Sequence, residues 1–456
     1  MRADAFRHAF QAGLWRDAAA APAPDLAKHH ADKLLRAAAL EDADDWAGLS
    51  QLTDLQLSLN EGPAAIRSLL AAIPLAPPEA LDELLEAAYA ALRGADPDEA
   101  AAILQALSAR FPGERQAFDD ALAAAPGAGP APEHGDGRQQ MLISCLAEAC
   151  AAAGHWDAAV DRFMRVPGGH GVLPENLSEL ARCVGRRYAP ERALRFRAPG
   201  GPRRVFDLFP YNGELLALKI RLDETASWVE KFIIVEARKT FSGLDKPLYY
   251  LEHKAELEAY ADKIVHVVVD AAPPELTLAW AREFHQRDSA VLGLSGLCAP
   301  DDLVLISDVD EILRREVVEA FDGVAASAEL RTFRMFLNCE VVRETRPRKT
   351  AMVRARLLAD NGSNYLRLGL ARYHRRHSVR GAGWHFTSVN DAEVLEMKFK
   401  SYSHEENAHL DRPALEARLE RMRTGGLKAD QFRREIDDSF PGYIRRNQDA
   451  LARFIL

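Results

Sequence analysis

Three carboxylates stand within four positions at the end of an apolar stretch. In the segment LVLISDVDEILRR (303–315), four apolar residues and a serine precede Asp308, Asp310 and Glu311. Carboxylates this close repel one another unless a positive charge lies among them. A metal ion or the N-terminal end of a helix can supply that charge.

Asp308 and Asp310 are two positions apart, so in an extended segment both side chains point the same way. Two carboxylates at the end of a strand suit Mn²⁺ or Mg²⁺, ions that are often bound by one or two carboxylates and by substrate phosphates. The pattern therefore predicts a site for one of these ions. A second interpretation stays open, in which Asp310 and Glu311 cap a helix that begins near Ile312.

The composition of the whole chain limits its partners and its location. The chain has 456 residues, 48% of them hydrophobic, which is enough for two or three domains. Its formal net charge of −10 argues against nucleic acid or an anionic membrane surface as the principal partner. The five scattered cysteines indicate reduced thiols. No stretch has the pattern of a signal peptide or of a membrane helix, so we expect a cytoplasmic protein without a transmembrane segment.

The first half of the chain predicts an all-α domain. Residues 1–197 are rich in alanine and leucine, which favour helices. Three stretches place paired alanines in a helix that stops at proline, namely GPAAIRSLLAAIP (62–74), PDEAAAILQALSARFP (97–112) and GHWDAAVDRFMRVP (154–167). This pattern is typical of tetratricopeptide-like repeats, and an irregular helical bundle is the alternative. We expect such a domain to bind a protein partner, and residues 198–204 to form a linker.

The second half, residues 205–456, predicts an α/β domain. Strands are expected at 204–209, 231–237, 263–270 and 302–307, with helices at 213–225, 248–260 and 280–295 between them. Strands separated by helices of this length form βαβ units and a mostly parallel sheet. Ligands of such sheets bind beyond the C-terminal ends of the strands, where Asp308 and Asp310 lie.

Residues 203–430 resemble glycosyltransferase family 17, a β-1,4-N-acetylglucosaminyltransferase-like family with the GT-A fold. The resemblance is carried, in order, by FDLFPYNGELLALKIRL (206–222), FIIVEARKTFSGLDKPLYYLE (232–252), KIVHVVVD (263–270), REFHQRDSAVLGL (282–294), DDLVLISDVDEI (301–312), GAGWHF (381–386), KFKSYSHEE (398–406) and RTGG (423–426). The chain has Leu313 where the family usually has a proline. The resemblance implies a Rossmann-like sheet and metal-dependent, inverting transfer of a sugar. The expected donor is UDP-N-acetylglucosamine, and the acceptor is a hydroxyl group on a glycan, glycolipid or protein.

The resemblance also implies which side chains form the site. Residues expected to contact the nucleotide sugar are Tyr211, Glu236, Arg282, Arg287, Asp288, Asp308 and Trp384, and those expected to hold Mn²⁺ or Mg²⁺ are Asp308, Asp310 and His385. Other interpretations stay open for several of them. Glu236 could be a solvent-facing loop carboxylate, Arg287 and Asp288 a surface ion pair, and Trp384 a core side chain.

A general base must deprotonate the acceptor hydroxyl. Glu340, just past an expected strand at 332–338, and Glu405 are the two candidates, and Glu405 could instead cap a helix near residue 406. Two other functions fit part of the pattern. A haloacid-dehalogenase-type phosphatase also has D-x-D after a strand, but it needs a threonine-like residue where Ile312 stands. A helical-repeat adaptor with an inactive, sugar-nucleotide-binding domain would have no need of the acidic pair.

Overall fold

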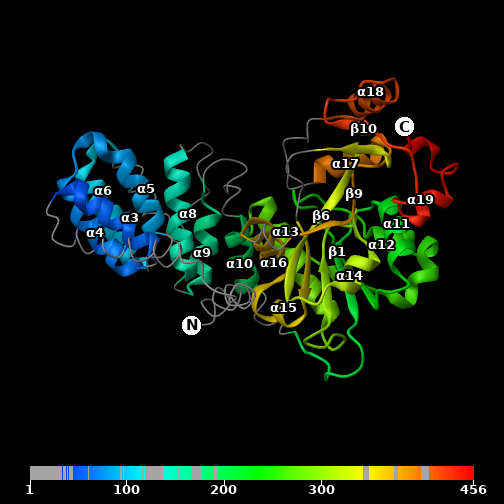
Figure 1. The fold of residues 1–456 in the computed structure, drawn as a ribbon, viewed down its shortest axis with the longest axis horizontal. Coiled ribbons are helices and arrows are strands. Elements are labelled where there is room, and N and C mark those ends of the chain that lie inside the picture. The colour runs from blue at the N-terminus through cyan, green and yellow to red at the C-terminus, as the bar shows by residue number, and fades with distance from the viewer. Residues whose placement is uncertain are drawn as a thin grey trace. The chain divides into compact units, whose positions relative to one another are not determined.

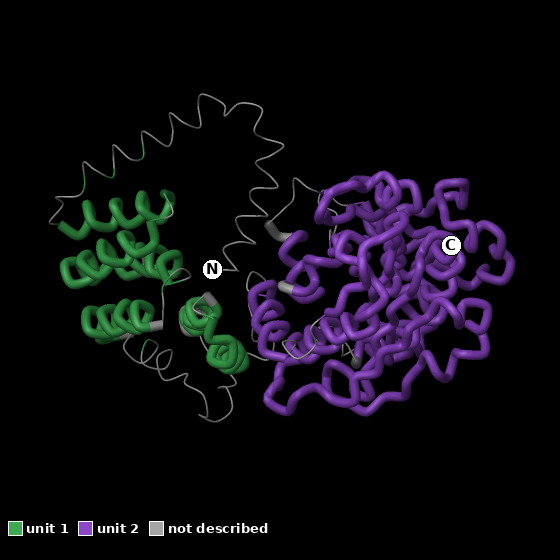
Figure 2. Tube along the Cα trace, turned by 90° about the horizontal axis from the view of Figure 1, so that it is seen from below, with its two compact units in different colours: residues 1–176 green, residues 177–456 purple. Residues whose placement is uncertain are grey.

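The structure is a computed structural model of the chain and contains two compact units. It describes residues 45–59, 61–92, 97–114, 137–152, 154–166, 177–188, 194–342, 349–373, 378–401 and 410–456, together with residues 33, 37, 40, 95 and 118. The first unit is residues 1–176 and the second is residues 177–456 (Figure 2).

The described part of the first unit is helical, as the alanine- and leucine-rich sequence predicts. Its α-helices are α3 (Trp46–Ser58), α4 (Gly62–Leu75), α5 (Leu81–Leu92), α6 (Pro97–Arg110), α8 (Gly137–Ala152) and α9 (Trp156–Phe163). Fully buried alanines such as Ala65, Ala72 and Ala88 allow neighbouring helices to approach closely around buried leucines. The tetratricopeptide-like assignment stays a prediction.

The second unit contains the sheet. Its strands are β1 (Val205–Pro210), β2 (Lys231–Ala237), β3 (Ile264–Val269), β4 (Leu303–Ile306), β5 (Glu311–Leu313), β6 (Ala325–Arg334), β7 (Cys339–Val341), β8 (Thr350–Arg354), β9 (Ser378–Thr387) and β10 (Gln431–Arg433). Its α-helices are α10 (Leu177–Tyr188), α11 (Leu215–Thr225), α12 (Tyr249–His253), α13 (Ala279–Ser289), α14 (Arg315–Ala320), α15 (Arg356–Asn361), α16 (Ser363–Tyr373), α17 (Ala392–Ser401), α18 (Arg412–Arg423) and α19 (Gly442–Arg446). Figure 1 shows the strands in the interior of this unit, with helices around them.

The sheet combines a parallel half with a mainly antiparallel half. β3, β2, β1 and β4 are neighbours and run parallel, which confirms the predicted βαβ units. β8, β6, β7 and β10 continue the sheet in antiparallel pairs, while β9 pairs with β6 in parallel and with β5 antiparallel. Phe206, Ile233 and Val304 are fully buried, as expected of central strands that are covered on both faces.

Helix α10 belongs to the α/β unit and not to the helical unit. It packs against α13 and α16. The chain that follows also joins the second unit, because the backbone N–H of Arg197 donates to the carbonyl of Cys298 (2.8 Å), and the N–H of Gly296 donates to that of Arg195 (2.7 Å). The boundary therefore lies after Asn176, earlier than the predicted boundary after residue 197.

The position of this boundary predicts how two fragments of the second unit unfold. A fragment that begins at Leu177 is expected to unfold in a single cooperative transition. A fragment that begins at Pro202 lacks α10, whose Leu180 and Val184 are fully buried, so its melting temperature is expected to be lower by about 10 °C. Differential scanning calorimetry of the two fragments measures the difference, and equal melting temperatures would contradict the assignment of α10.

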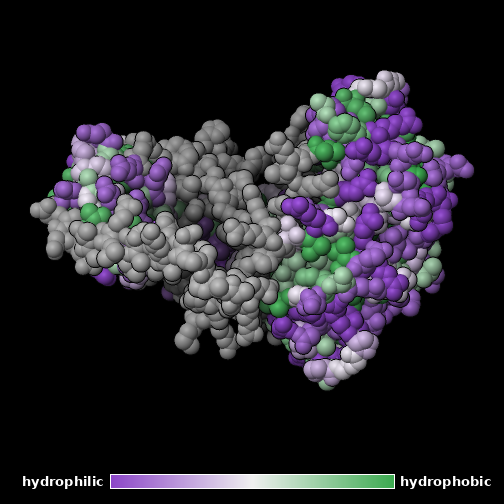
Figure 3. All heavy atoms as spheres, viewed as in Figure 1, coloured by the Kyte–Doolittle hydropathy of each residue, from purple (hydrophilic) through white to green (hydrophobic). Residues whose placement is uncertain are grey.

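Hydrophilic side chains cover much of the visible face of the second unit, with smaller hydrophobic areas between them (Figure 3). Within the described ranges, no helix is both long enough and apolar enough to cross a membrane.

Candidate active site

The acidic segment forms a tight turn between two strands. β4 ends at Ile306 and β5 begins at Glu311, whose backbone N–H donates to the carbonyl of Asp308 (3.0 Å). β5 pairs with β9, which places Glu311 opposite His385. Residues 311–313 are therefore a strand, and the next helix, α14, begins only at Arg315. The interpretation of Asp310 and Glu311 as caps of a helix near residue 312 is wrong.

One buried arginine holds this turn in place. Arg221, on α11, is 2% exposed, and its Nη1 donates to the carbonyl oxygens of Asp308 (2.8 Å) and Glu311 (2.7 Å). Its Nη2 donates to Ser307 Oγ (2.6 Å), and its Nε to Asp207 Oδ2 (2.7 Å). A guanidinium group can do this because it carries five donors in a rigid plane. The backbone of the turn is thus fixed by a side chain from a different element.

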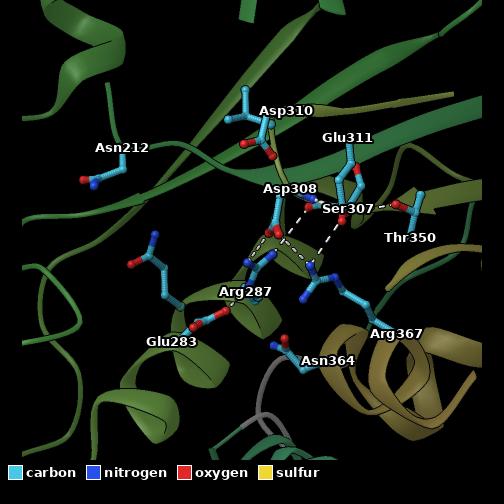
Figure 4. Close-up of polar contacts among 12 residues, drawn as sticks. Asn212, Glu283, Arg287, Ser307, Asp308, Asp310, Glu311, Thr350, Asn364 and Arg367 are labelled. Atoms are coloured by element: carbon cyan, nitrogen blue, oxygen red, sulfur yellow. Dashed lines mark hydrogen bonds and ion pairs between the residues drawn. The ribbon is translucent and has the colours of Figure 1, made fainter. Parts of the chain in front are cut away.

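Asp308 is bound by two arginines. Arg287, on α13, donates through Nη2 to Oδ1, and Arg367, on α16, donates through Nη2 to Oδ2 (2.7 Å). Figure 4 shows Asp308 lying between them. Burial would raise the pKa of the Asp308 carboxyl, but the guanidinium groups of Arg287 and Arg367 lower it well below its ordinary value. Both oxygens of Asp308 already have cationic partners, so a metal ion at Asp308 would compete with two guanidinium groups.

Asp310 points to different partners. Its Oδ2 lies 3.3 Å from Lys398 Nζ, and its Oδ1 lies 3.6 Å from His385 Nε2. Burial raises the pKa of the Asp310 carboxyl, and Lys398 and His385 only partly oppose that rise. Metal bonds of about 2.0–2.2 Å can bridge two donor atoms 3.6 Å apart. The distance between Asp310 Oδ1 and His385 Nε2 is therefore compatible with a shared divalent ion.

The three expected metal ligands do not converge on one point. In the part of the chain that the structure describes, no group of three or more His, Cys, Asp or Glu side chains is arranged to hold a metal ion. The expectation that Asp308 and Asp310 point the same way is wrong, because residues 308–310 form a turn and not an extended segment.

The turn lines a cleft at the C-terminal ends of β1, β2 and β4. Asp308, Val309 and Asp310 line this cleft, and its other walls include Tyr211, Glu214, Phe241, Lys246, Arg287 and Lys398. The edge of the sheet is the one predicted from the sequence. Of the residues expected to bind the donor, Tyr211, Arg287 and Asp308 lie in the cleft wall. The Tyr211 hydroxyl also shares a hydrogen bond with His253 Nδ1 (2.7 Å).

Glu236 and Arg282 hold loops near the cleft. Glu236 is fully buried and accepts hydrogen bonds from the backbone N–H groups of Tyr249 (2.9 Å) and Tyr250 (3.0 Å), so it fixes the start of α12. It is therefore not a solvent-facing loop carboxylate. Arg282 donates through Nε to the carbonyl of Phe241 (2.6 Å) and thereby positions a residue of the cleft wall. The geometry supports a positioning role for both, and their expected contact with the donor stays a prediction.

Asp288 caps a helix and does not reach the cleft wall. Its Oδ1 accepts hydrogen bonds from the backbone N–H groups of Ser363 (2.7 Å) and Asn364 (3.0 Å), the first residues of α16. Gly362 precedes them with φ +66°, and a Cβ there would lie 3.1 Å from the Asp288 oxygens. Asp288 therefore positions α16, the helix that carries Arg367 to Asp308. The interpretation of Arg287 and Asp288 as a surface ion pair is wrong, because both are buried and have other partners.

Asp288→Ala is expected to destabilise the start of α16. Loss of a buried cap costs about 1–2 kcal/mol, and hydrogen exchange in peptides that span residues 363–373 should accelerate. Asp288→Asn keeps an acceptor oxygen, and burial raises the pKa of the Asp288 carboxyl, so the charge itself adds little to stability at neutral pH. The asparagine variant should therefore exchange almost as slowly as the wild type. Equal exchange in the alanine variant and the wild type would show that Asp288 is not a cap.

Trp384 is a core side chain. It is 3% exposed and packs with Ile312, Phe333 and Phe386. Its Nε1–H donates to the carbonyl of Ser439 (2.8 Å). The preceding Gly383 allows β9 to lie against β5, because a Cβ there would be 1.9 Å from the carbonyl oxygen of Ile312. The expected contact of Trp384 with the sugar is wrong, and the core-packing interpretation is confirmed.

Glu340 does not fit the role of general base. It lies on β7, and its oxygens accept hydrogen bonds from Arg331 Nε (3.0 Å) and Arg434 Nε (2.6 Å). Burial would raise the pKa of Glu340, but the two arginines lower it overall, which weakens the carboxylate as a base. Glu340 is also absent from the cleft wall. The second candidate, Glu405, lies outside the described residues.

Arg221, Arg367 and Lys398 belong to the site but are not among the predicted residues. For Arg221 the sequence contains a signal, since this basic residue falls on the same face of α11 as the buried Leu218 and Thr225. Lys398 has no such signal. It stands two positions before Lys400 in the same helix, and the sequence alone does not show which of the two is buried.

The fold and the cleft define an α/β protein whose polar site lies at the C-terminal ends of parallel strands. The comparison with protein families gives the class of reaction. A family model described as Glycosyltransferase family 17 matches residues 194–426, and the chain belongs to this family. The enzyme is therefore a glycosyltransferase. Searches of curated proteins and of solved structures gave no match.

Proposed function

We propose that this glycosyltransferase moves N-acetylglucosamine from UDP-N-acetylglucosamine to a hydroxyl group of a glycan, glycolipid or protein, with inversion at the anomeric carbon. The acceptor oxygen forms a bond to the anomeric carbon, and the bond from that carbon to the diphosphate oxygen breaks. The proton of the hydroxyl goes to a general base, and the electron pair of the broken bond leaves with UDP. The observation that carries the proposal is the acidic turn, which faces the cleft of a family 17 chain.

Asp310 and His385 are the residues that we propose for Mn²⁺ or Mg²⁺, with phosphates and water as the remaining ligands. When bound, such an ion offsets the charge that develops on the departing diphosphate. Asp308 acts through its two arginines. They hold the turn against α13 and α16, so that Asp310 is presented to the cleft.

The other residues of the cleft bind and orient the donor. Phe241 contributes aromatic surface, which suits a nucleobase or a sugar ring, and Tyr211, which is 1% exposed, lies in the same wall. Arg287 contributes positive charge at the same wall. Glu405 is our proposed general base, because the other candidate, Glu340, is bound by Arg331 and Arg434. The helical first unit is our proposed place for a protein partner.

A ligand screen tests the proposal. A ligand that binds only the native state raises its melting temperature, so UDP-N-acetylglucosamine with Mn²⁺ should stabilise the protein more than the GDP- or ADP-sugars do. Hydrolysis of the bound donor then separates the enzyme from a helical-repeat adaptor, which would bind the donor without turning it over. Stabilisation by a GDP-sugar alone would contradict the proposed donor.

A further inference from the structure

Lys398 is a buried lysine in the wall of the cleft. Its side chain is 6% exposed, and it lies on α17. The residues around it join α17 to the segment that follows β2. The hydroxyl of Tyr249 donates to Met397 Sδ (3.3 Å), and Ser242 Oγ donates to the carbonyl of Lys400 (3.1 Å). These contacts hold α17, the helix that carries Lys398, against the segment that follows β2.

The ammonium group lies between two carboxylates that come from different strand ends. It is 3.3 Å from Asp310 Oδ2, after β4, and 3.2 Å from Glu214 Oε1, after β1. The other oxygen of Glu214 accepts a hydrogen bond from the backbone N–H of Asn212 (3.1 Å). Both lysine contacts are longer than the 2.7–2.9 Å of a tight charge-assisted hydrogen bond. The positive charge is thus placed between Asp310 and Glu214 at the cleft wall.

Lys398 offsets negative charge in the cleft wall. Asp310 and Glu214 would repel the phosphates of a donor, and the ammonium group offsets that repulsion. Arg287 also lines the cleft, but its guanidinium group is bound to Asp308 and Glu283. A compact ammonium charge is a common phosphate ligand in proteins.

We propose that Lys398 is a donor-binding residue whose ammonium group contacts the diphosphate, next to the pair Asp310 and His385. This assignment rests on the proposed function, because it requires a donor that leaves as a nucleoside diphosphate. The Lys398 ammonium group would add its positive charge to that of a divalent ion at Asp310 and His385.

Isothermal titration calorimetry of Lys398→Met against the wild type tests the assignment. The probes are uridine, UDP and inorganic pyrophosphate, each with Mn²⁺ and again in EDTA. Affinity for UDP and for pyrophosphate should fall by at least about tenfold in the variant, the scale of one hydrogen bond to a charged group. The difference in UDP affinity between the wild type and the variant should persist in EDTA, where no divalent ion is bound. Affinity for uridine should be unchanged.

Two further variants serve as controls. Lys398→Arg keeps the charge and should keep more of the UDP affinity than the methionine variant does. Lys400→Met removes a lysine from the same helix whose side chain is 54% exposed and pairs with Glu396, so it should bind UDP like the wild type.

The outcomes separate the assignment from the proposed function. Unchanged UDP affinity in Lys398→Met would overturn the role of Lys398 while leaving the donor chemistry in place. An equal loss of affinity for uridine and UDP, with a lower melting temperature, would assign the lysine a structural role and also overturn the proposal. Failure of the wild type to hydrolyse any nucleotide sugar would overturn the proposed function itself.

Discussion

Asp310→Asn is expected to reduce turnover of the donor by at least about 10²-fold, the scale of losing one electrostatic contributor to a transition state. The substitution keeps the size of the side chain and removes the charge that would face both a divalent ion and Lys398. The melting temperature without ligand should hold or rise, because burial raises the pKa of the Asp310 carboxyl and because Lys398 keeps Glu214 as a partner after the substitution. Turnover against Mn²⁺ concentration and the melting temperature are the two measurements.

Asp308→Asn is the matched control for this prediction. It makes the same chemical change two residues earlier, but Asp308 is bound by Arg287 and Arg367, which are themselves buried. Removing one partner of a buried ion pair leaves an uncompensated charge, so this variant should lose stability as well as activity. Near-wild-type turnover in Asp310→Asn would refute the metal assignment. Equal loss of stability in both variants would refute the division of roles between the two aspartates.

Arg221→Met is expected to lower the free energy of unfolding by about 3–5 kcal/mol, the scale of breaking a buried ion pair. Asp207, which is 1% exposed, would be left buried without the bidentate arginine, and the turn carbonyls of Asp308 and Glu311 would lose a donor. The methionine fills much of the same volume, so a cavity contributes little to the loss. Urea denaturation measures the change.

An exposed arginine provides the comparison for this variant. Arg315→Met removes a surface pair with Glu319, in which both side chains are 55% exposed, and stability should hardly change. The loss of activity in Arg221→Met should be larger than the loss of folded protein, because the turn that carries Asp310 is no longer held in the molecules that remain folded. Wild-type stability of Arg221→Met would show that the turn is fixed by other contacts.

The parallel half of the sheet could be predicted because its signals are local. The predicted strand at 231–237 coincides with β2, and the other three strands of this half differ by one residue at each end. Continuous apolar runs and helical periodicity depend on neighbouring residues along the chain. The location of the acidic cluster at the end of β4 follows from the same signals.

The partners of the site residues could not be predicted, because they are set by tertiary contacts. Asp308 and Asp310 diverge, since Arg221 holds their backbone in a turn, and α11 is distant in sequence from that turn. Trp384 and His385 are adjacent, yet one lies in the core and the other lies near Asp310, because successive residues of β9 point to opposite faces. The pattern contained both residues but did not show which one lies near Asp310.

Release of UDP from UDP-N-acetylglucosamine by the wild-type protein is the most direct test of the proposed chemistry. Purified protein is incubated with the donor and with increasing Mn²⁺, and free UDP is measured beside the same reaction with Asp310→Asn. We expect release that depends on Mn²⁺ in the wild type and is reduced by at least about 10²-fold in the variant. Saturable binding of UDP-N-acetylglucosamine without any release of UDP, in the wild type and with Mn²⁺ present, would contradict it.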